Sequence, residues 1–277
     1  EAPGIVEKYH GIASGAINGD EHLSGGSPSQ GAELCGVVEQ MFSLETMMEV
    51  FGEPELADRL ERVAFNAYPA SISEDYMAHQ YLQQANQILV SNAKRNWFNN
   101  GDDSNLFGLE PNFGCCTANM HQGWPKFVQH LWYATVDNGV AALVYASSEV
   151  KMQVANNILV NIKEETYYPF DETVSFSITY PDKKIKKATF PFHLRVPEWC
   201  KKPIVNLNGQ TIKTDVTGER MIILNREWQQ NDKITIEFPA TISISHWFDG
   251  GAVVERGPLV YALKLNEKWE KKTFDSP

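Results

Sequence analysis

Apolar residues in the first half of the chain recur at steps of three and four. One such series comprises Val37, Val38, Met41, Leu44, Met48 and Phe51. This period lines one face of a helix, so it predicts a core-facing helix from Cys35 to Phe51. Gly52 and Pro54 end that helix, and Pro54 suits the first position of the next. The second helix presents Leu56, Leu60, Val63, Ala64 and Ala67, and the short link predicts an antiparallel helix pair.

The remainder of this half is less regular. Residues 1–29 contain several glycines and are interpreted as loops, and residues 70–114 are mixed and rich in Asn, Gln and aromatic side chains. A third helix is predicted from Thr117 to about Ala134, with a kink or restart at Pro125. Its expected inward residues are Met120, Trp124, Phe127, Val128 and Leu131.

The apolar period changes to two after Asp137-Asn138-Gly139. Alternation runs through residues 174–178, 190–196 and 234–238, and Asn208-Gly209 is a strong hairpin signal. Short strands at regular spacing predict an antiparallel β-sandwich. The sequence therefore predicts an α+β protein with a helical domain over residues 1–137 and a β-sandwich domain over residues 138–277.

Composition excludes several classes of protein. The 277 residues are 43% hydrophobic and 21% charged, which is typical of a globular chain. A net charge of −11 argues against nucleic acid or an anionic membrane as the main partner. No apolar run approaches the roughly 20 residues of a membrane span.

Three of the four cysteines fall in two short motifs, Glu33-Leu34-Cys35 and Asn112-Phe113-Gly114-Cys115-Cys116-Thr117-Ala118-Asn119. Adjacent cysteines rarely bridge each other, because a disulfide needs more widely spaced α-carbons. A pair beside a helix start is also favoured as thiolates by the helix dipole. With Glu33 and Cys35 they form a four-ligand set suited to zinc; a reactive thiol site without metal and inert buried cysteines are the alternatives. Cys200 is interpreted as a buried small apolar residue.

The zinc hypothesis requires an extended backbone at Glu33. Residues two apart on a helix point about 200° apart, so Glu33 and Cys35 cannot face one ion from a regular helix. Gly31 makes an extended entry plausible, with the helix beginning around Cys35. The competing interpretation is a capping box at Ser27–Gln30, which would start the helix earlier and split the site.

These motifs resemble glycoside hydrolase family 127, the β-L-arabinofuranosidase-like proteins, and its close relatives. The resemblance rests on Glu33-x-Cys35, the segment 60–67 (LERVAFNA) and the Cys115-Cys116 pair, and extends to segments 192–199 (FHLRVPEW) and 255–261 (ERGPLVY). It implies an (α/α)6 barrel followed by β-sandwich domains. The chain then holds the C-terminal part of the barrel, and the missing N-terminal barrel half comes from the same protein or another fragment.

The resemblance also implies site residues. Cys115 corresponds to a zinc-bound nucleophile of a retaining glycosidase, and Glu33, Cys35 and Cys116 to the other zinc ligands. Glu21 corresponds to the general acid/base, with Asp20 as a possible substitute. Glu61, Tyr81 and His79 are expected to contact the substrate, an L-arabinofuranose-containing or related plant-type glycan. A periplasmic or secreted location is expected for such an enzyme.

Two alternatives remain at this stage. One is a different metal or thiol enzyme on the same scaffold, for instance one that acts on unusual acidic sugars. The other is a non-catalytic carbohydrate-binding protein with a structural zinc site. Replacement of Cys115 distinguishes the glycosidase from the binding protein, because only the glycosidase needs its thiol for turnover.

Overall fold

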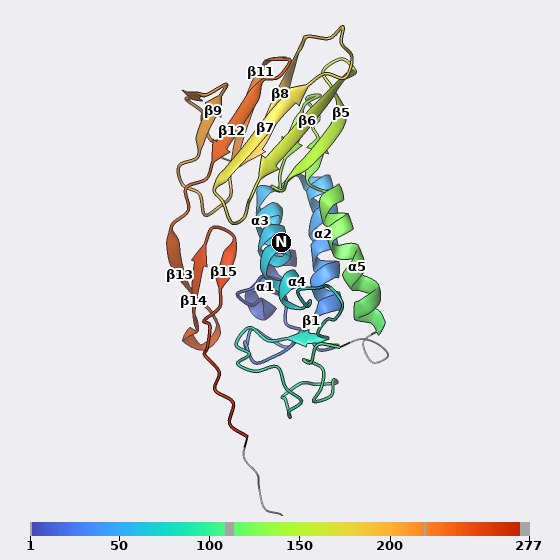
Figure 1. Ribbon diagram of the computed structural model, residues 1–277, viewed down its shortest axis with the longest axis vertical. Helices are drawn as coiled ribbons and strands as arrows, with labels where there is room; N and C mark the ends of the chain where they lie inside the picture. Colours follow the sequence, from blue (N-terminus) through green and yellow to red (C-terminus); the bar gives the residue numbers. More distant parts are fainter. Residues whose placement is uncertain (1, 109–113, 219, 272–277) are drawn as a thin grey trace, which may run out of the picture.

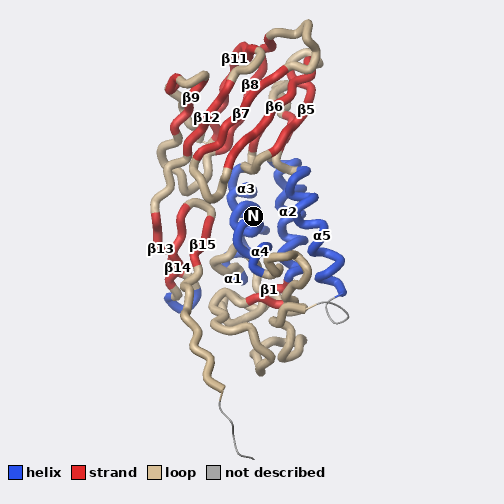
Figure 2. The backbone as a smooth tube through the Cα atoms, viewed as in Figure 1, coloured by secondary structure: helices blue, strands red, loops and turns tan. Residues whose placement is uncertain are grey.

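The computed structural model describes residues 2–108, 114–218 and 220–271, and it confirms the predicted α+β class (Figure 1). The helices are α1 (Ala2–His10), α2 (Leu34–Phe51), α3 (Pro54–Arg62), the π-helical turn η1 (Val63–Ala67), α4 (Tyr68–Ala70) and α5 (Gly114–Gln129). Figure 2 shows the helices in one half of the molecule and two of the sheets in the other, with a third sheet beside the helices. No helix in these described ranges is long and apolar enough to cross a membrane.

The predicted antiparallel helix pair is present as α2 and α3. Gly52 ends α2 with φ 66°, and its N–H donates to the carbonyl of Met48 at 2.9 Å. Pro54 occupies the first turn of α3, as expected. The predicted inward residues of both helices are buried except Phe51, which is 61% exposed at the end of α2.

Helix α5 is shorter than the sequence predicted. It runs through Pro125 and ends at Gln129 rather than near Ala134, because residues 132–134 form strand β3 (Trp132–Ala134) and pair with β4 (Val140–Ala142). Val128, predicted to face inward, is 57% exposed. The helical period of apolar residues continues beyond Gln129, where the chain instead forms a strand. Periodicity alone does not show that strand pairing is the more stable choice there.

Two sheets form the half of the molecule remote from α1. The larger has the strand order β10-β9-β12-β7-β6-β5 and the smaller the order β11-β8-β4-β3. Their remaining strands are β5 (Ser148–Val154), β6 (Ile158–Thr166), β7 (Thr173–Thr179), β8 (Lys187–Arg195), β9 (Ile204–Leu207), β10 (Gln210–Ile212), β11 (Met221–Gln229) and β12 (Lys233–Glu237). Alternate residues of both sheets enter one core, where the rings of Phe176 and Phe192 lie 5.2 Å apart. Pairing is antiparallel except between β4 and β8, which are parallel.

The hairpin signal at Asn208-Gly209 is confirmed. These two residues join β9 to β10 with φ values of 51° and 82°. Positive φ at both positions is the type I′ conformation that suits the twist of a two-residue hairpin.

A third sheet, β13 (Ile242–His246), β14 (Ala252–Arg256) and β15 (Leu259–Tyr261), lies beside the helices (Figure 1). Arg62 forms an ion pair with Glu255 at 2.5 Å. The Asn66 amide donates to the carbonyl of Pro258 and accepts from the N–H of Val260. Strands β13 to β15 therefore form a separate sheet that contacts the helices. They are not part of the single β-sandwich that the sequence predicted over residues 138–277.

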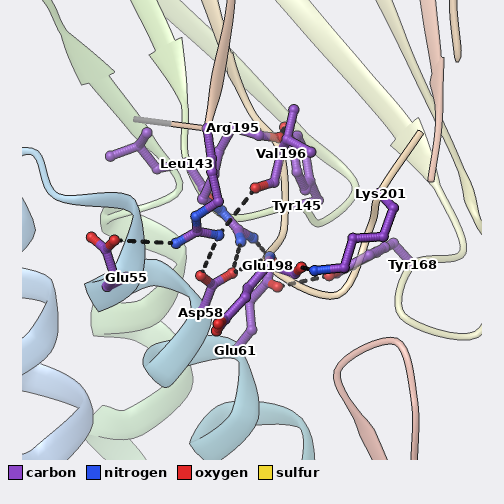
Figure 3. A network of polar contacts seen from close by, with 11 residues as sticks. Glu55, Asp58, Glu61, Leu143, Tyr145, Tyr168, Arg195, Val196, Glu198 and Lys201 are labelled. Atoms are coloured by element: carbon purple, nitrogen blue, oxygen red, sulfur yellow. Dashed lines mark hydrogen bonds and ion pairs between the residues drawn. The ribbon is translucent and has the colours of Figure 1, made fainter. Parts of the chain in front are cut away.

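A buried ionic network joins the helices to the two larger sheets (Figure 3). Arg195, at the end of β8, pairs with Asp58 at 2.5 Å and with Glu61, both on α3. Glu61 also accepts a hydrogen bond from the Tyr168 hydroxyl at 2.7 Å. Burial raises the pKa of Glu61, and the Arg195 charge opposes that rise. This position argues against the predicted sugar contact, because Glu61 is 1% exposed and its carboxylate already binds two protein groups.

Candidate functional site

The first pair of candidate ligands lies where an extended segment becomes helix α2. Strand β1 (Ala32–Glu33) pairs with β2 (Leu82–Gln83), and Glu33 has φ −72° and ψ 136° immediately before the helix. The extended conformation required at Glu33 is therefore present, and the capping-box alternative is wrong. A Cβ added at Gly31 would lie 2.8 Å from Leu82, so this glycine allows the close approach of the two strands.

The second pair lies in the first turn of α5. Helices α2 and α5 pack side by side and begin at the same end of the helical half (Figure 1). The Cys35 and Cys116 sulfurs consequently lie 3.2 Å apart, although 81 residues separate them in sequence. The ligand atoms of Glu33, Cys35, Cys115 and Cys116 all lie within 4.8 Å of one another. The structure thus brings together the four residues that the sequence nominated.

The four members differ in exposure. Cys116 is buried, Cys35 and Glu33 are partly buried, and Cys115 is exposed. Cys115 is therefore the cysteine of this cluster that an incoming molecule reaches most readily. Cys200 is buried elsewhere, in the core of the two larger sheets, as expected.

Mutual proximity and burial disfavour charge within the cluster. The nearby Cys116 sulfur, and then burial, raise the pKa of Cys35. Burial is the main cause of the raised pKa values of Cys115 and Glu33. The protein alone therefore favours the neutral thiols of Cys35 and Cys115.

The donor set fits a zinc ion. Ligand atoms bound tetrahedrally to one zinc lie roughly 3.3–3.8 Å apart, given metal–ligand bonds of about 2.0–2.3 Å. The four atoms here span up to 4.8 Å, so small side-chain movements would suffice. Three thiolates and one carboxylate also favour zinc over magnesium or calcium, which prefer oxygen ligands.

Tyr81 connects this cluster to Glu21. It directly precedes β2, and its carbonyl accepts from the N–H of Leu34 at 3.0 Å. Its hydroxyl donates a short hydrogen bond to the Glu21 carboxylate. The same hydroxyl is close enough to Cys115 and Glu33 to oppose part of the rise in their pKa values. Burial, and then the bond to Glu21, raise the pKa of Tyr81 itself.

The two acidic neighbours Asp20 and Glu21 occupy different environments. Asp20 is fully buried and its carboxylate accepts from the backbone N–H groups of Phe98 and Asn99 and from the Asn100 amide. Glu21 is exposed, with φ 60°. These contacts favour Glu21 over Asp20 as a proton donor, because Asp20 anchors a loop and does not face solvent.

His79 lies behind the cysteines. It is 1% exposed, and its Nε2 lies 2.7 Å from the Thr117 hydroxyl in the first turn of α5. This burial argues against the predicted sugar contact of His79. Its contact with Thr117 instead fixes the turn that contains Cys115 and Cys116.

Sequence reasoning missed the neighbours that orient the sulfurs. Asn119 hydrogen-bonds Cys35 and partly opposes the rise in the pKa of that thiol. The sequence feature that could have revealed these neighbours is the position of Thr117 and Asn119, which follow the cysteine pair in the first turns of α5. Residues 112–113 of the cysteine motif lie outside the described residues.

A cavity of about 600 Å³ opens beside the cluster. Its lining includes Glu21 and Glu33, other loop residues between positions 15 and 23, and residues of α1, α2 and α3 such as Val6, Leu44 and Met47. The three cysteines are not part of this lining, so Glu33 is the member of the cluster that lines the cavity.

Sequence models of two domains match the chain. One is described as β-L-arabinofuranosidase, GH127 catalytic domain, and matches residues 9–129. The other is described as β-L-arabinofuranosidase, GH127 middle domain, and matches residues 139–240. A curated relative is the non-reducing end β-L-arabinofuranosidase of Bifidobacterium longum, 22% identical over 241 residues, which are 84% of this chain and 35% of that protein.

Solved structures show the same fold. A GH127 β-L-arabinofuranosidase from Geobacillus stearothermophilus T6 aligns with a TM-score of 0.79 at 19% identity, over 92% of this chain and 41% of that one. A GH127 β-arabinofuranosidase aligns with a TM-score of 0.72 at 21% identity, over 92% and 42%. The chain thus spans well under half the length of these relatives.

Proposed function

The chain belongs to glycoside hydrolase family 127, and from this premise we propose that it forms part of a retaining glycosidase with a zinc-bound cysteine nucleophile. The observation that supports this most is the convergence of Glu33, Cys35, Cys115 and Cys116 within 4.8 Å. Inert structural cysteines have no need of a carboxylate and an exposed thiol in the same cluster.

The ligands divide into holding and reacting groups. Glu33, Cys35 and Cys116 would hold zinc from β1, α2 and α5, and Cys115 would complete the set from the exposed side. Zinc, when bound, supplies the positive charge that keeps coordinated thiols deprotonated. Cys115 is then the thiolate that attacks the anomeric carbon of the substrate.

Glu21 would act as general acid and then general base. Its protonated carboxyl group gives a proton to the departing oxygen while Cys115 forms the sugar–sulfur bond. The resulting Glu21 carboxylate then takes a proton from the water that cleaves that bond. The Tyr81 hydroxyl, bonded to Glu21 and close to Cys115, supports this assignment because it holds the two groups on one side of the site.

The substrate is proposed from the relatives. Their names describe β-L-arabinofuranosidases, one of which acts at the non-reducing end. We therefore expect a terminal L-arabinofuranose to be the sugar that is transferred to Cys115 and then released by water. We also propose that further helices complete an (α/α)6 barrel with α1, α2, α3 and α5. The apolar wall of the cavity, with Val6, Leu44 and Met47, supports such a covering layer.

Replacement of Cys115 tests the nucleophile. In the intact protein, Cys115→Ala should reduce hydrolysis of 4-nitrophenyl β-L-arabinofuranoside at least about 10³-fold, because the reaction loses its covalent route. Binding of L-arabinose should persist. Cys200→Ala, which removes a thiol outside the cluster, should remain active. Hydrolysis unchanged in Cys115→Ala would contradict the assignment and favour a non-catalytic carbohydrate-binding protein.

A further inference from the structure

A second cavity, of about 650 Å³, lies on another side of α1. Its wall includes Tyr9 from α1, Gly25 and Gly26 from the loop after Glu21, and Trp247 and Phe248 from the turn between β13 and β14. We call these five residues the aromatic groove. We propose that the aromatic groove binds the part of a glycan chain that lies beyond the terminal sugar released at the catalytic site.

The aromatic residues are exposed within the described part of the chain. Tyr9 and Phe248 are 59% and 54% exposed, and Trp247 is partly exposed. Trp247 is held in place from behind: its Nε1–H donates to the Ser245 hydroxyl at 2.8 Å, and the Arg62 guanidinium lies 5.3 Å from its ring. Three aromatic rings around one groove provide apolar faces for the C–H faces of sugars, a common arrangement in ligand sites.

Two glycines and several charged groups form the rest of the groove. Gly25 and Gly26 add no side chains to its wall, and a Cβ added at Gly26 would lie 3.7 Å from the Phe248 ring. Glu7, Lys8 and His246 also line the cavity. Carboxylate, ammonium and imidazole groups can all bond sugar hydroxyls, which both donate and accept.

One loop connects the groove with the catalytic site. The Asn18 amide donates to the carbonyls of Gly25 and Ser27, both at 2.8 Å, and this closes the loop from Asn18 to Ser27. Glu21 projects from that loop into the first cavity, and Gly25 and Gly26 form the wall of the second. Glu7, ion-paired with Arg59, lines both cavities. A glycan with its end at Glu21 can therefore extend across this loop into the aromatic groove.

The proposal rests on the proposed function for its ligand class, so its test compares a long and a short substrate. The probes are a β-L-arabinofuranosyl trisaccharide and 4-nitrophenyl β-L-arabinofuranoside. In the intact protein, Tyr9→Ala and Phe248→Ala should each raise KM for the trisaccharide about tenfold, which is about 1.4 kcal/mol. KM for the aryl glycoside should not change. Tyr167→Ala is the matched control, because it removes a tyrosine that is 82% exposed on another loop.

Equal changes in KM for both substrates, or no change for either, would overturn the proposal that the aromatic groove binds the glycan. Both replaced side chains are largely exposed, so the variants should fold, and their unfolding temperatures check this. If the parent protein hydrolyses neither probe, the proposed function fails while the groove is still tested by titration of the trisaccharide. Weaker trisaccharide binding in Tyr9→Ala and Phe248→Ala, with binding of free L-arabinose unchanged, would support the groove. Unchanged trisaccharide binding in both variants, or no binding by the parent, would overturn it.

Discussion

At the residue scale, the two adjacent cysteines have different environments. Cys116 is buried beside Cys35, and Cys115 is exposed and adjoins Tyr81. One helical step separates their side chains by about 100°, so one can face the ligand cluster while the other also faces solvent. This difference is the reason for our proposal that Cys116 only holds the metal and that Cys115 attacks the sugar.

Replacement of Glu21 tests the proposed proton donor. Glu21→Gln should reduce kcat about 10²–10⁴-fold, because an amide cannot exchange the proton. Tyr81→Phe should cause a smaller loss, since it removes only the hydrogen bond that orients Glu21. Steady-state rates on the aryl glycoside measure both. A Glu21→Gln enzyme as active as the parent would contradict the assignment.

Glu45 predicts a pH dependence of stability that is separate from catalysis. It is fully buried on α2, and neither carboxylate oxygen has a hydrogen-bond partner among the described residues. His130 Nδ1 lies 3.4 Å away but also bonds the Lys126 carbonyl at 2.7 Å. Burial raises the pKa of Glu45 to about 7, and the charge of Lys126 opposes the rise.

The sign follows from the raised pKa. The folded state prefers the protonated carboxyl, so its contribution to stability is complete below the ordinary pKa near 4.5 and is lost as the pH rises toward about 7. The free energy of unfolding falls by on the order of 3 kcal/mol over this pH range. Glu45→Gln should flatten this decline and stabilise the protein at pH 8. Denaturant unfolding of the parent protein and of Glu45→Gln at pH 5 and pH 8 measures this difference. An equal pH dependence of stability in the two proteins would contradict the account.

At the element scale, the ionic network on α3 fixes the helices against the sheets. Arg195 is fully buried and pairs with Asp58 and Glu61. Arg195→Met should destabilise the protein by about 3–5 kcal/mol, because buried carboxylates lose their cation. Combining it with Glu61→Gln should recover part of that loss. Denaturant unfolding measures both variants, and a fully additive double variant would contradict coupling through this pair.

Secondary structure was predictable wherever one local pattern determined it. The periods of α2 and α3 and the hairpin at Asn208-Gly209 required only neighbouring residues. The early end of α5 depends on the pairing of Trp132–Ala134 with β4, which the helical period does not record. The parallel contact of β4 with β8 joins segments about fifty residues apart and lies equally beyond local patterns.

At the scale of the whole molecule, the site depends on long-range assembly. The motif Glu33-x-Cys35 and the cysteine pair identified the candidate ligands in advance, because their residue types are typical of metal or thiol chemistry. Their convergence required β1 to pair with β2 and the starts of α2 and α5 to coincide. The burial of Glu61 was not predictable from sequence, since its partner Arg195 lies on a strand of the other half.

The central claim is that the cysteine cluster binds zinc, and the most direct test is the metal content of the freshly purified intact protein. The account predicts about one zinc per chain, falling to near zero in Cys35→Ala and unchanged in Cys200→Ala. Dialysis against a strong chelator should remove the zinc together with hydrolysis of the aryl glycoside. Less than about half an equivalent of zinc in the parent protein, or full occupancy in Cys35→Ala, would contradict it.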